Sequence, residues 1–146
     1  MKALSVHPFY ADAIVSGLKG VEVRTWRTDY RGDLLICSTQ KLYHGTIPGH
    51  ALGVVKLVDV VPLKKKHLKD AMMPESDYNP NFFAWVLDDN RLIVPIPVKG
   101  KLSLWNFEHD ELIQYIPPEE WTETEENAGS DEPGEWWYKY WEPLIT

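Results

Sequence analysis

The sequence predicts an α+β fold, a small mixed β-barrel of five to seven strands with a few short helices. Most apolar and β-branched runs are short, and Gly, Pro, Asn or Asp separates them, which is typical of strands joined by turns. Helical periodicity is confined to a few brief segments. A chain of 146 residues is long enough to bury one sizeable core, which predicts one such barrel.

The first predicted elements are a strand, a helix and a second strand. Leu4-Ser5-Val6 predicts the first strand, and Pro8 suits the first turn of a helix that continues to Ser16 and ends at Gly17. Residues 21–26 then alternate in character, which predicts a strand. One face of that strand would carry Glu22, Arg24 and Trp26.

The rest of the barrel is predicted from four further strands, at residues 33–39, 51–61, 82–87 and 92–98. A turn at 88–90 would join the last two strands, and Gly53 is a candidate bulge. Short helices are expected at 64–73, where lysines gather, and at 108–115.

We expect two regions in the chain: residues 1–115 as the barrel, and residues 116–146 as an acidic loop followed by an aromatic C-terminal strand that packs on the barrel. Residues 119–135 hold eight acidic side chains and no basic one. The aromatic segment 136–141 is predicted to close or flank the barrel, and a surface for a protein partner is the alternative.

The distribution of charge matters more than its sum of −7, because removing the acidic stretch leaves the remaining chain at +1. An anionic ligand is therefore not excluded. Non-specific duplex binding is disfavoured, since that mode needs many phosphate contacts.

The sequence contains no run that predicts a transmembrane helix and no secretion signal at its start, so no membrane association is expected. Its single cysteine, Cys37, lies in an apolar run and predicts a buried, inert thiol. A cytoplasmic location follows as an expectation.

The densest group of charges begins at Gly17-Leu18-Lys19-Gly20-Val21-Glu22-Val23-Arg24, where the first predicted helix ends and the next predicted strand begins. Charges beside apolar segments are costly to bury unpaired, so these either neutralise one another at the surface or form a site for a polar or anionic ligand. The pattern Gly17-x-Lys19-x-x-Glu22-x-Arg24 resembles the signature of the ASCH family, which has the PUA-like fold. Further blocks at 53–59, 83–87 and 98–105 extend the resemblance over roughly residues 3–107.

The resemblance implies a small barrel with a cleft beside the signature, suited to RNA, single-stranded nucleic acid or a modified nucleoside. Some members of that family are nucleic-acid-binding modules of transcription coactivators. One bacterial branch hydrolyses the acetyl amide of N4-acetylcytidine, and ribonuclease activity is associated with another member. The family alone does not fix one activity.

The candidate ligand-binding residues are basic, acidic and aromatic side chains near the signature and around Gly100: Lys19, Glu22, Arg24, Trp26, Arg27, Tyr30, Arg31, Lys99 and Lys101. Lys19 would be a base if the cleft were dry, and an exposed turn lysine otherwise. Glu22 and Arg24 would contact a base or phosphate, with a surface ion pair as the alternative. Trp26 would stack on a base, while Arg27 and Arg31 would hold phosphate.

A departure from the hydrolase branch bears on catalysis. In that branch the position of Glu22 carries a threonine thought to be the nucleophile, and Glu22 cannot do that work in the same way. Alternation places Thr25 on the opposite face of the strand from Glu22. We therefore expect a module that binds RNA, single-stranded nucleic acid or a modified nucleotide, without metal or cofactor. The alternative is a metal-independent hydrolase of a modified nucleoside or of RNA, with Lys19 and Glu22 as its catalytic residues.

Overall fold

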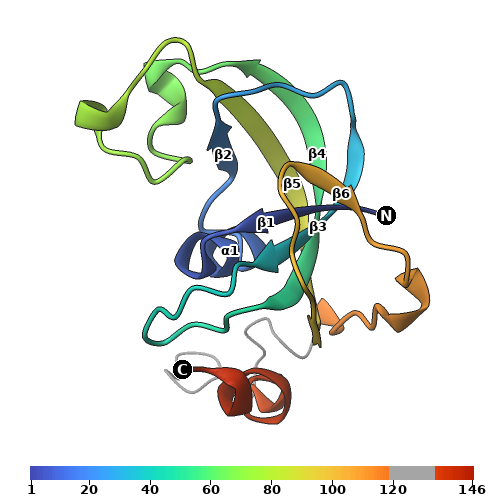
Figure 1. Ribbon diagram of the computed structural model, residues 1–146. Helices are drawn as coiled ribbons and strands as arrows, with labels where there is room; N and C mark the ends of the chain where they lie inside the picture. Colours follow the sequence, from blue (N-terminus) through green and yellow to red (C-terminus); the bar gives the residue numbers. More distant parts are fainter. Residues whose placement is uncertain (119–133) are drawn as a thin grey trace.

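One curled β-sheet organises the protein in the computed structural model, which describes residues 1–118 and 134–146 (Figure 1). Within those residues six strands lie in the order β2-β5-β4-β3-β1-β6. Their bounds are β1 Lys2–Val6, β2 Val21–Arg24, β3 Gly32–Ser38, β4 His50–Pro62, β5 Phe83–Pro97 and β6 Leu104–Asn106. Strand β1 runs parallel to β3, and every other pairing is antiparallel. The predicted small mixed barrel of the PUA-like α+β class is confirmed, in the form of a six-stranded half-barrel.

The two long strands, β4 and β5, give the sheet its curl. They pair over most of their length with three shifts of register, and such bulges bend strands and increase their twist. One shift lies beside Gly53, the predicted bulge residue. A Cβ atom at Gly53 would lie 2.6 Å from Cγ1 of Val15, so glycine is what allows the helix to pack this closely against the sheet.

Helix α1, Pro8–Val15, occupies the hollow of the curled sheet, as predicted from Pro8 and Gly17. His7 caps its start, because Nδ1 accepts a hydrogen bond from the backbone N–H of Phe9 at 3.1 Å. Gly17 ends the helical segment with φ of +87°, a conformation that favours glycine. The apolar side of α1 packs with residues of β1, β3 and β4 into the main core.

The segment 63–82 covers β2 and the adjacent end of β5. Leu63, Leu68 and Ala71 are buried against Val21 and Ala84. The helix predicted at 64–73 is wrong, since only a 3-10 turn, η1 at Lys65–His67, forms there, followed by η2 at Glu75–Asp77. Burial of these apolar side chains, together with local turn hydrogen bonds such as the one from the N–H of Ala71 to the carbonyl of His67, fixes this segment without a continuous helix.

Two other expectations about secondary structure are corrected. The turn predicted at 88–90 does not separate two strands, because β5 continues through it with a positive φ of 51° at Asp89. The helix predicted at 108–115 is reduced to η3, Asp110–Leu112, and Tyr115 instead forms a β-bridge with Ile93. In both places pairing with the long sheet prevails over local propensity.

The aromatic segment predicted as a C-terminal strand is helical: η4 is a π-helical turn at Trp137–Trp141, and η5 a 3-10 turn at Glu142–Leu144. A strand would send consecutive aromatic rings to opposite faces, whereas a helical turn gathers Trp137 and Trp141 on one side. Their rings stack with centroids 6.3 Å apart, and Trp141 is buried in the main core. Figure 1 shows these turns in red at the end of the sheet away from segment 63–82.

The division at residue 115 stays a prediction, and residues 119–133, most of the acidic stretch, lie outside the described residues. No helix in the described part of the chain is long and apolar enough to cross a bilayer.

Candidate functional site

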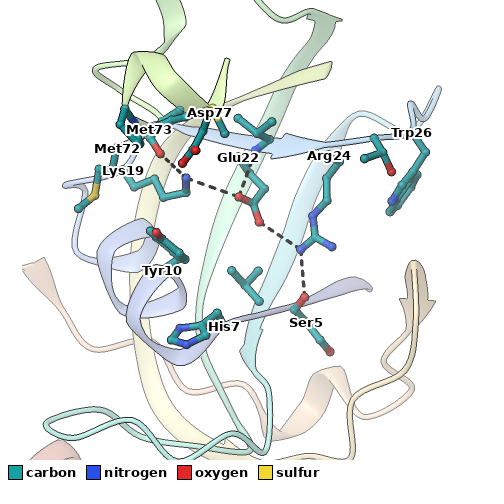
Figure 2. Close-up of a pocket in the computed structure, with 15 residues that line it drawn as sticks. Ser5, His7, Tyr10, Lys19, Glu22, Arg24, Trp26, Met72, Met73 and Asp77 are labelled. Atoms are coloured by element: carbon teal, nitrogen blue, oxygen red, sulfur yellow. Dashed lines mark hydrogen bonds and ion pairs between the residues drawn. The ribbon is translucent and has the colours of Figure 1, made fainter. Parts of the chain in front are cut away.

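A cleft of about 510 Å³ opens between the start of α1, strand β2 and residues 71–77 (Figure 2). Its walls come from segments far apart in the sequence, because the curl of the sheet brings β2 toward β1 although they are not neighbours in it. Four of the predicted site residues line the cleft: Lys19, Glu22, Arg24 and Trp26.

Lys19 is buried, with 5% of its side chain exposed. Its Nζ donates a hydrogen bond to the carbonyl oxygen of Ala71 at 2.6 Å and lies 4.9 Å from the centre of the Tyr10 ring. The backbone is held at the same place, since the N–H groups of Gly20 and Val21 both donate to the carbonyl of Asp70. Lys19 is therefore fixed by the segment that covers it, unlike an exposed turn lysine.

Glu22 links Lys19 to Arg24. Its Oε1 lies 3.6 Å from Nζ of Lys19, and its Oε2 lies 3.1 Å from Nη2 of Arg24. Oε1 also accepts a hydrogen bond from the backbone N–H of Val23 at 3.1 Å. With 10% of its side chain exposed, this carboxylate needs those partners, because an unpaired buried charge is strongly destabilising.

Arg24 continues the chain of contacts to the other side of the cleft. Its Nη2 donates to the carbonyl oxygen of Ser5 at 3.0 Å as well as to Glu22. Ser5 lies just beyond the β1 residues that pair with β6, so its carbonyl is left to accept a bond from another element. Figure 2 shows Lys19, Glu22, Arg24 and Ser5 in one line of interactions that joins β2 to β1. Among the described residues, Nε and Nη1 of Arg24 have no hydrogen-bond partner.

The electrostatics of the cleft are nearly balanced. Burial lowers the pKa of Lys19 below the ordinary lysine value, and the nearby Glu22 carboxylate offsets part of that effect. Burial, with a smaller contribution from Lys41, also lowers the pKa of His7, which therefore lines the cleft as a neutral ring at pH 7. Asp77, on segment 71–77, also lines the cleft (Figure 2). Two cations thus face two carboxylates.

Trp26 forms one end of the cleft (Figure 2). Its ring meets the buried ring of Trp85 edge to face, with centroids 4.8 Å apart and an interplanar angle of 82°. The indole N–H of Trp85 donates to the backbone carbonyl of Trp26 at 3.2 Å. These contacts hold Trp26 in place and leave its side chain half-buried at the mouth of the cleft.

The other predicted site residues lie outside this cleft. Arg27 is exposed near Asp29, with 3.9 Å between nitrogen and oxygen, and Arg31 pairs with Asp59 at 3.4 Å. The hydroxyl of Tyr30 donates to the backbone carbonyl of Asp33, and its ring packs on the main core. Lys99 and Lys101 lie on the loop before β6, and Lys101 lines a separate hollow described below.

The structure adds cleft residues that alternation and spacing did not indicate. Thr25 lines the same cleft as Glu22, just beyond the end of β2 at Arg24, and so does Val23, which alternates with Glu22 along the strand. The placement of Thr25 on the opposite face of the strand stays a prediction. Tyr10, His7 and Asp77 also line it. Of these, only His7 lay beside a sequence signal, since Pro8 predicted the start of the first helix. Segment 71–77 reaches the cleft through tertiary folding, which no local pattern indicates.

The fold and the cleft define a small α+β half-barrel protein with a lysine–glutamate–arginine chain in the cleft beside α1 and β2. The chain belongs to the ASCH domain family, whose model matches residues 4–97. It is similar to activating signal cointegrator 1 of Homo sapiens, with 28% identity over 129 positions, and to that of Mus musculus, with 26%. Each match covers 72% of this chain and 22% of the relative, so the chain spans about a fifth of their length.

A solved structure agrees on the fold. The crystal structure of ASCH from Zymomonas mobilis superposes with a TM-score of 0.60 at 22% identity, covering 75% of this chain and 89% of that one. A single-residue variant of the same protein gives a TM-score of 0.59. At this level of identity the likeness supports the fold and not a shared activity.

Proposed function

We propose that the cleft binds one nucleotide of an RNA or another single-stranded nucleic acid, with the base inserted between Trp26 and the Lys19–Glu22–Arg24 chain. The observation that carries this proposal is that Trp26 and Arg24 line one open cleft of about 510 Å³, a size typical of small-ligand sites, and that Nε and Nη1 of Arg24 have no partner among the described residues. Trp26 supplies a stacking surface, and base–aromatic stacking contributes about 1–3 kcal/mol in single-strand binding.

The balance of charge favours a base over a phosphate as the occupant of this cleft. Lys19 and Arg24 already face Glu22, and Asp77 adds a second carboxylate to the wall. A phosphate here would meet two acidic groups, whereas a neutral base can accept from Arg24 and donate to a carboxylate. The ligand is therefore recognised through the polar edge and the face of its base.

The family supports a nucleic-acid ligand. The resemblance stated above associates ASCH domains with nucleic-acid binding, and the human and mouse relatives bear the name of a signal cointegrator. Because this chain spans only about a fifth of those relatives, their activity as whole proteins does not transfer to it. The proposal concerns the ASCH cleft alone.

The test is a titration of the protein with the common ribonucleosides, deoxyribonucleosides and short single-stranded oligonucleotides, followed by Trp fluorescence and calorimetry. Arg24→Gln is expected to weaken binding at least about tenfold, the equivalent of one charged hydrogen bond. Arg27→Gln is the matched control, since Arg27 is an exposed arginine outside the cleft, and it should bind nearly as well as the wild type. Equal affinity of wild type and Arg24→Gln for every probe would refute the proposal.

A second candidate function is hydrolysis of a modified nucleoside or of RNA. Two observations favour it: burial lowers the pKa of Lys19, as a general base requires, and Thr25 lines the same cleft. Wild-type protein would then release acetate from N4-acetylcytidine or cleave labelled RNA, and Lys19→Met would abolish that turnover. Binding without turnover by the wild type leaves the binding module as the function.

A further inference from the structure

A second hollow of about 270 Å³ lies beside the cleft, and the two share Ser5 and Arg24. The hydrogen bond from Arg24 to the Ser5 carbonyl therefore forms part of the boundary between them. On its far side the hollow is bounded by Gln40 and by residues 100–103 of the loop that leads into β6. A ligand that extends past Arg24 would enter this hollow next.

The loop 99–103 is held in an unusual arrangement. A Cβ atom at Gly100 would lie only 2.3 Å from the hydroxyl oxygen of Ser5, so the loop backbone packs directly against β1 at the boundary between the two hollows. Ser103 has a positive φ of 59°, which is uncommon for a residue other than glycine. Leu102 is 93% exposed and lines the hollow, so its side chain is available for contact with a ligand. Strained backbone and an exposed apolar side chain meet at this one loop.

The charge of the second hollow differs from that of the cleft. Arg24 and Lys101 line it, and none of its lining residues is acidic. Lys101 makes no ion pair within the described residues, whereas Arg27, Arg31 and Arg91 all lie near carboxylates. The remaining lining side chains include the hydroxyls of Ser5, Thr39 and Ser103. A net positive hollow with hydroxyl groups suits a phosphate and its sugar.

We propose that this second hollow is a subsite for the adjoining nucleotide of the same strand, with the linking phosphate held between Arg24 and Lys101. The proposal rests on the proposed function, in which a base occupies the neighbouring cleft. The second base lies against Leu102, which supplies an apolar contact that needs no particular base. The preferred ligand is thus a single strand of two or more nucleotides and not a free nucleoside.

The test compares three probes of increasing length by calorimetry: a nucleoside, its monophosphates, and a dinucleoside monophosphate, each in ribo and deoxy form. Wild-type protein should bind the dinucleoside monophosphate at least about tenfold tighter than the nucleoside. Lys101→Gln should remove most of that gain and leave nucleoside affinity unchanged. It should also reduce the dependence of log affinity on log salt by about 0.7, the value for one phosphate contact on a single strand.

Lys99→Gln is the matched control, because Lys99 has the same charge on the same loop but lines neither hollow. Equal binding of nucleoside and dinucleoside monophosphate would overturn the subsite and leave the proposed base cleft intact. A monophosphate as tight as the dinucleoside monophosphate would overturn it too, since the second nucleotide then contributes nothing. Equal losses of affinity in Lys99→Gln and Lys101→Gln would also overturn it, because they would show that each lysine acts only through its long-range charge. If no probe binds, or if Arg24→Gln binds as the wild type does, the proposed function itself fails.

Discussion

Two carboxylates of this protein make the same local contacts in different surroundings. Glu22 accepts the backbone N–H of Val23 and pairs with Arg24 at 3.1 Å, while Asp59 accepts the backbone N–H of Val60 and pairs with Arg31 at 3.4 Å. The side chain of Glu22 is 10% exposed, and that of Asp59 is 58% exposed. Glu22 alone has a second cation, Lys19, beside it.

The position of a carboxylate relative to the curled sheet, and not its residue type, decides whether it forms part of a buried cluster of charges or a surface ion pair. Both arginines belong to one short basic stretch of sequence, yet only Arg24 lies on the strand that faces the cleft. Water screens the exposed pair, whereas the buried group depends on its own members for compensation of charge. The consequences of removing each charge should therefore differ in size and in their response to salt.

The largest effect is expected from Glu22→Gln, which keeps an oxygen to accept from Val23 but removes the charge between Lys19 and Arg24. Lys19, which is buried, and Arg24, which is partly buried, would then lack the carboxylate that they share. Breaking a buried ion pair by removing one partner destabilises by about 3–5 kcal/mol, and we expect a loss of that order. Urea unfolding followed by Trp fluorescence measures it. A loss below about 1 kcal/mol would mean that water compensates both cations and that the group is not a desolvated site.

Arg24→Gln should have the next largest effect. It leaves the Ser5 carbonyl without its donor, while Glu22 keeps Lys19 as a partner. We expect a loss of about 1–3 kcal/mol, the range for an unsatisfied buried polar group. The double variant Glu22→Gln/Arg24→Gln should lose less than the sum of the two single variants, because the contacts are shared. Additive losses in urea unfolding would contradict the shared network.

Lys19 predicts a dependence of stability on alkaline pH. Burial lowers its pKa in the folded protein, so between that pKa and the ordinary lysine value of 10.5 the unfolded chain binds more protons than the folded one. The contribution of Lys19 to the free energy of unfolding therefore rises with pH across that interval. Wild-type stability relative to Lys19→Met should increase as pH approaches 10.5. A difference that stays constant or falls in urea titrations at successive pH values would show that the ammonium is not desolvated.

The sequence predicted the elements whose signals are local. Pro8 and Gly17 bound the first helix, and alternation over residues 21–26 predicted the strand that carries Glu22 and Arg24, which ends at Arg24 in the structure. The family signature grouped Lys19, Glu22 and Arg24, alternation added Trp26, and all four line the cleft. The helix and the strand were predicted successfully because capping and strand alternation depend on near neighbours, while the binding role of the cleft residues stays a prediction.

The remaining features depend on contacts between distant segments. Strand β2 stops at Arg24, which the alternating pattern does not reveal, and Thr25 lines the cleft just beyond that end. The carbonyl of Ala71 meets Lys19 because apolar residues of segment 63–82 are buried against β2. Trp141 reaches the core through a helical turn, where the run of aromatic residues predicted a strand. In each case tertiary packing prevails over local propensity.

The smallest effect is expected from Asp59→Asn, the surface counterpart of Glu22→Gln. The amide oxygen keeps the hydrogen bond from Val60, and Arg31 keeps its bonds to the carbonyls of Thr28 and Tyr30. The loss should stay within about 0.5 kcal/mol and vanish at high salt, because salt screens exposed charges over a few ångströms. The loss in Glu22→Gln should persist under the same conditions, since buried pairs are screened much less. Urea unfolding of both variants at low and high salt measures how the loss of stability in each variant depends on salt concentration. If the two losses decreased equally with salt, Glu22 and Asp59 would lie in equivalent environments. The interaction of Glu22 with Lys19 and Arg24 would then be no different from a surface ion pair.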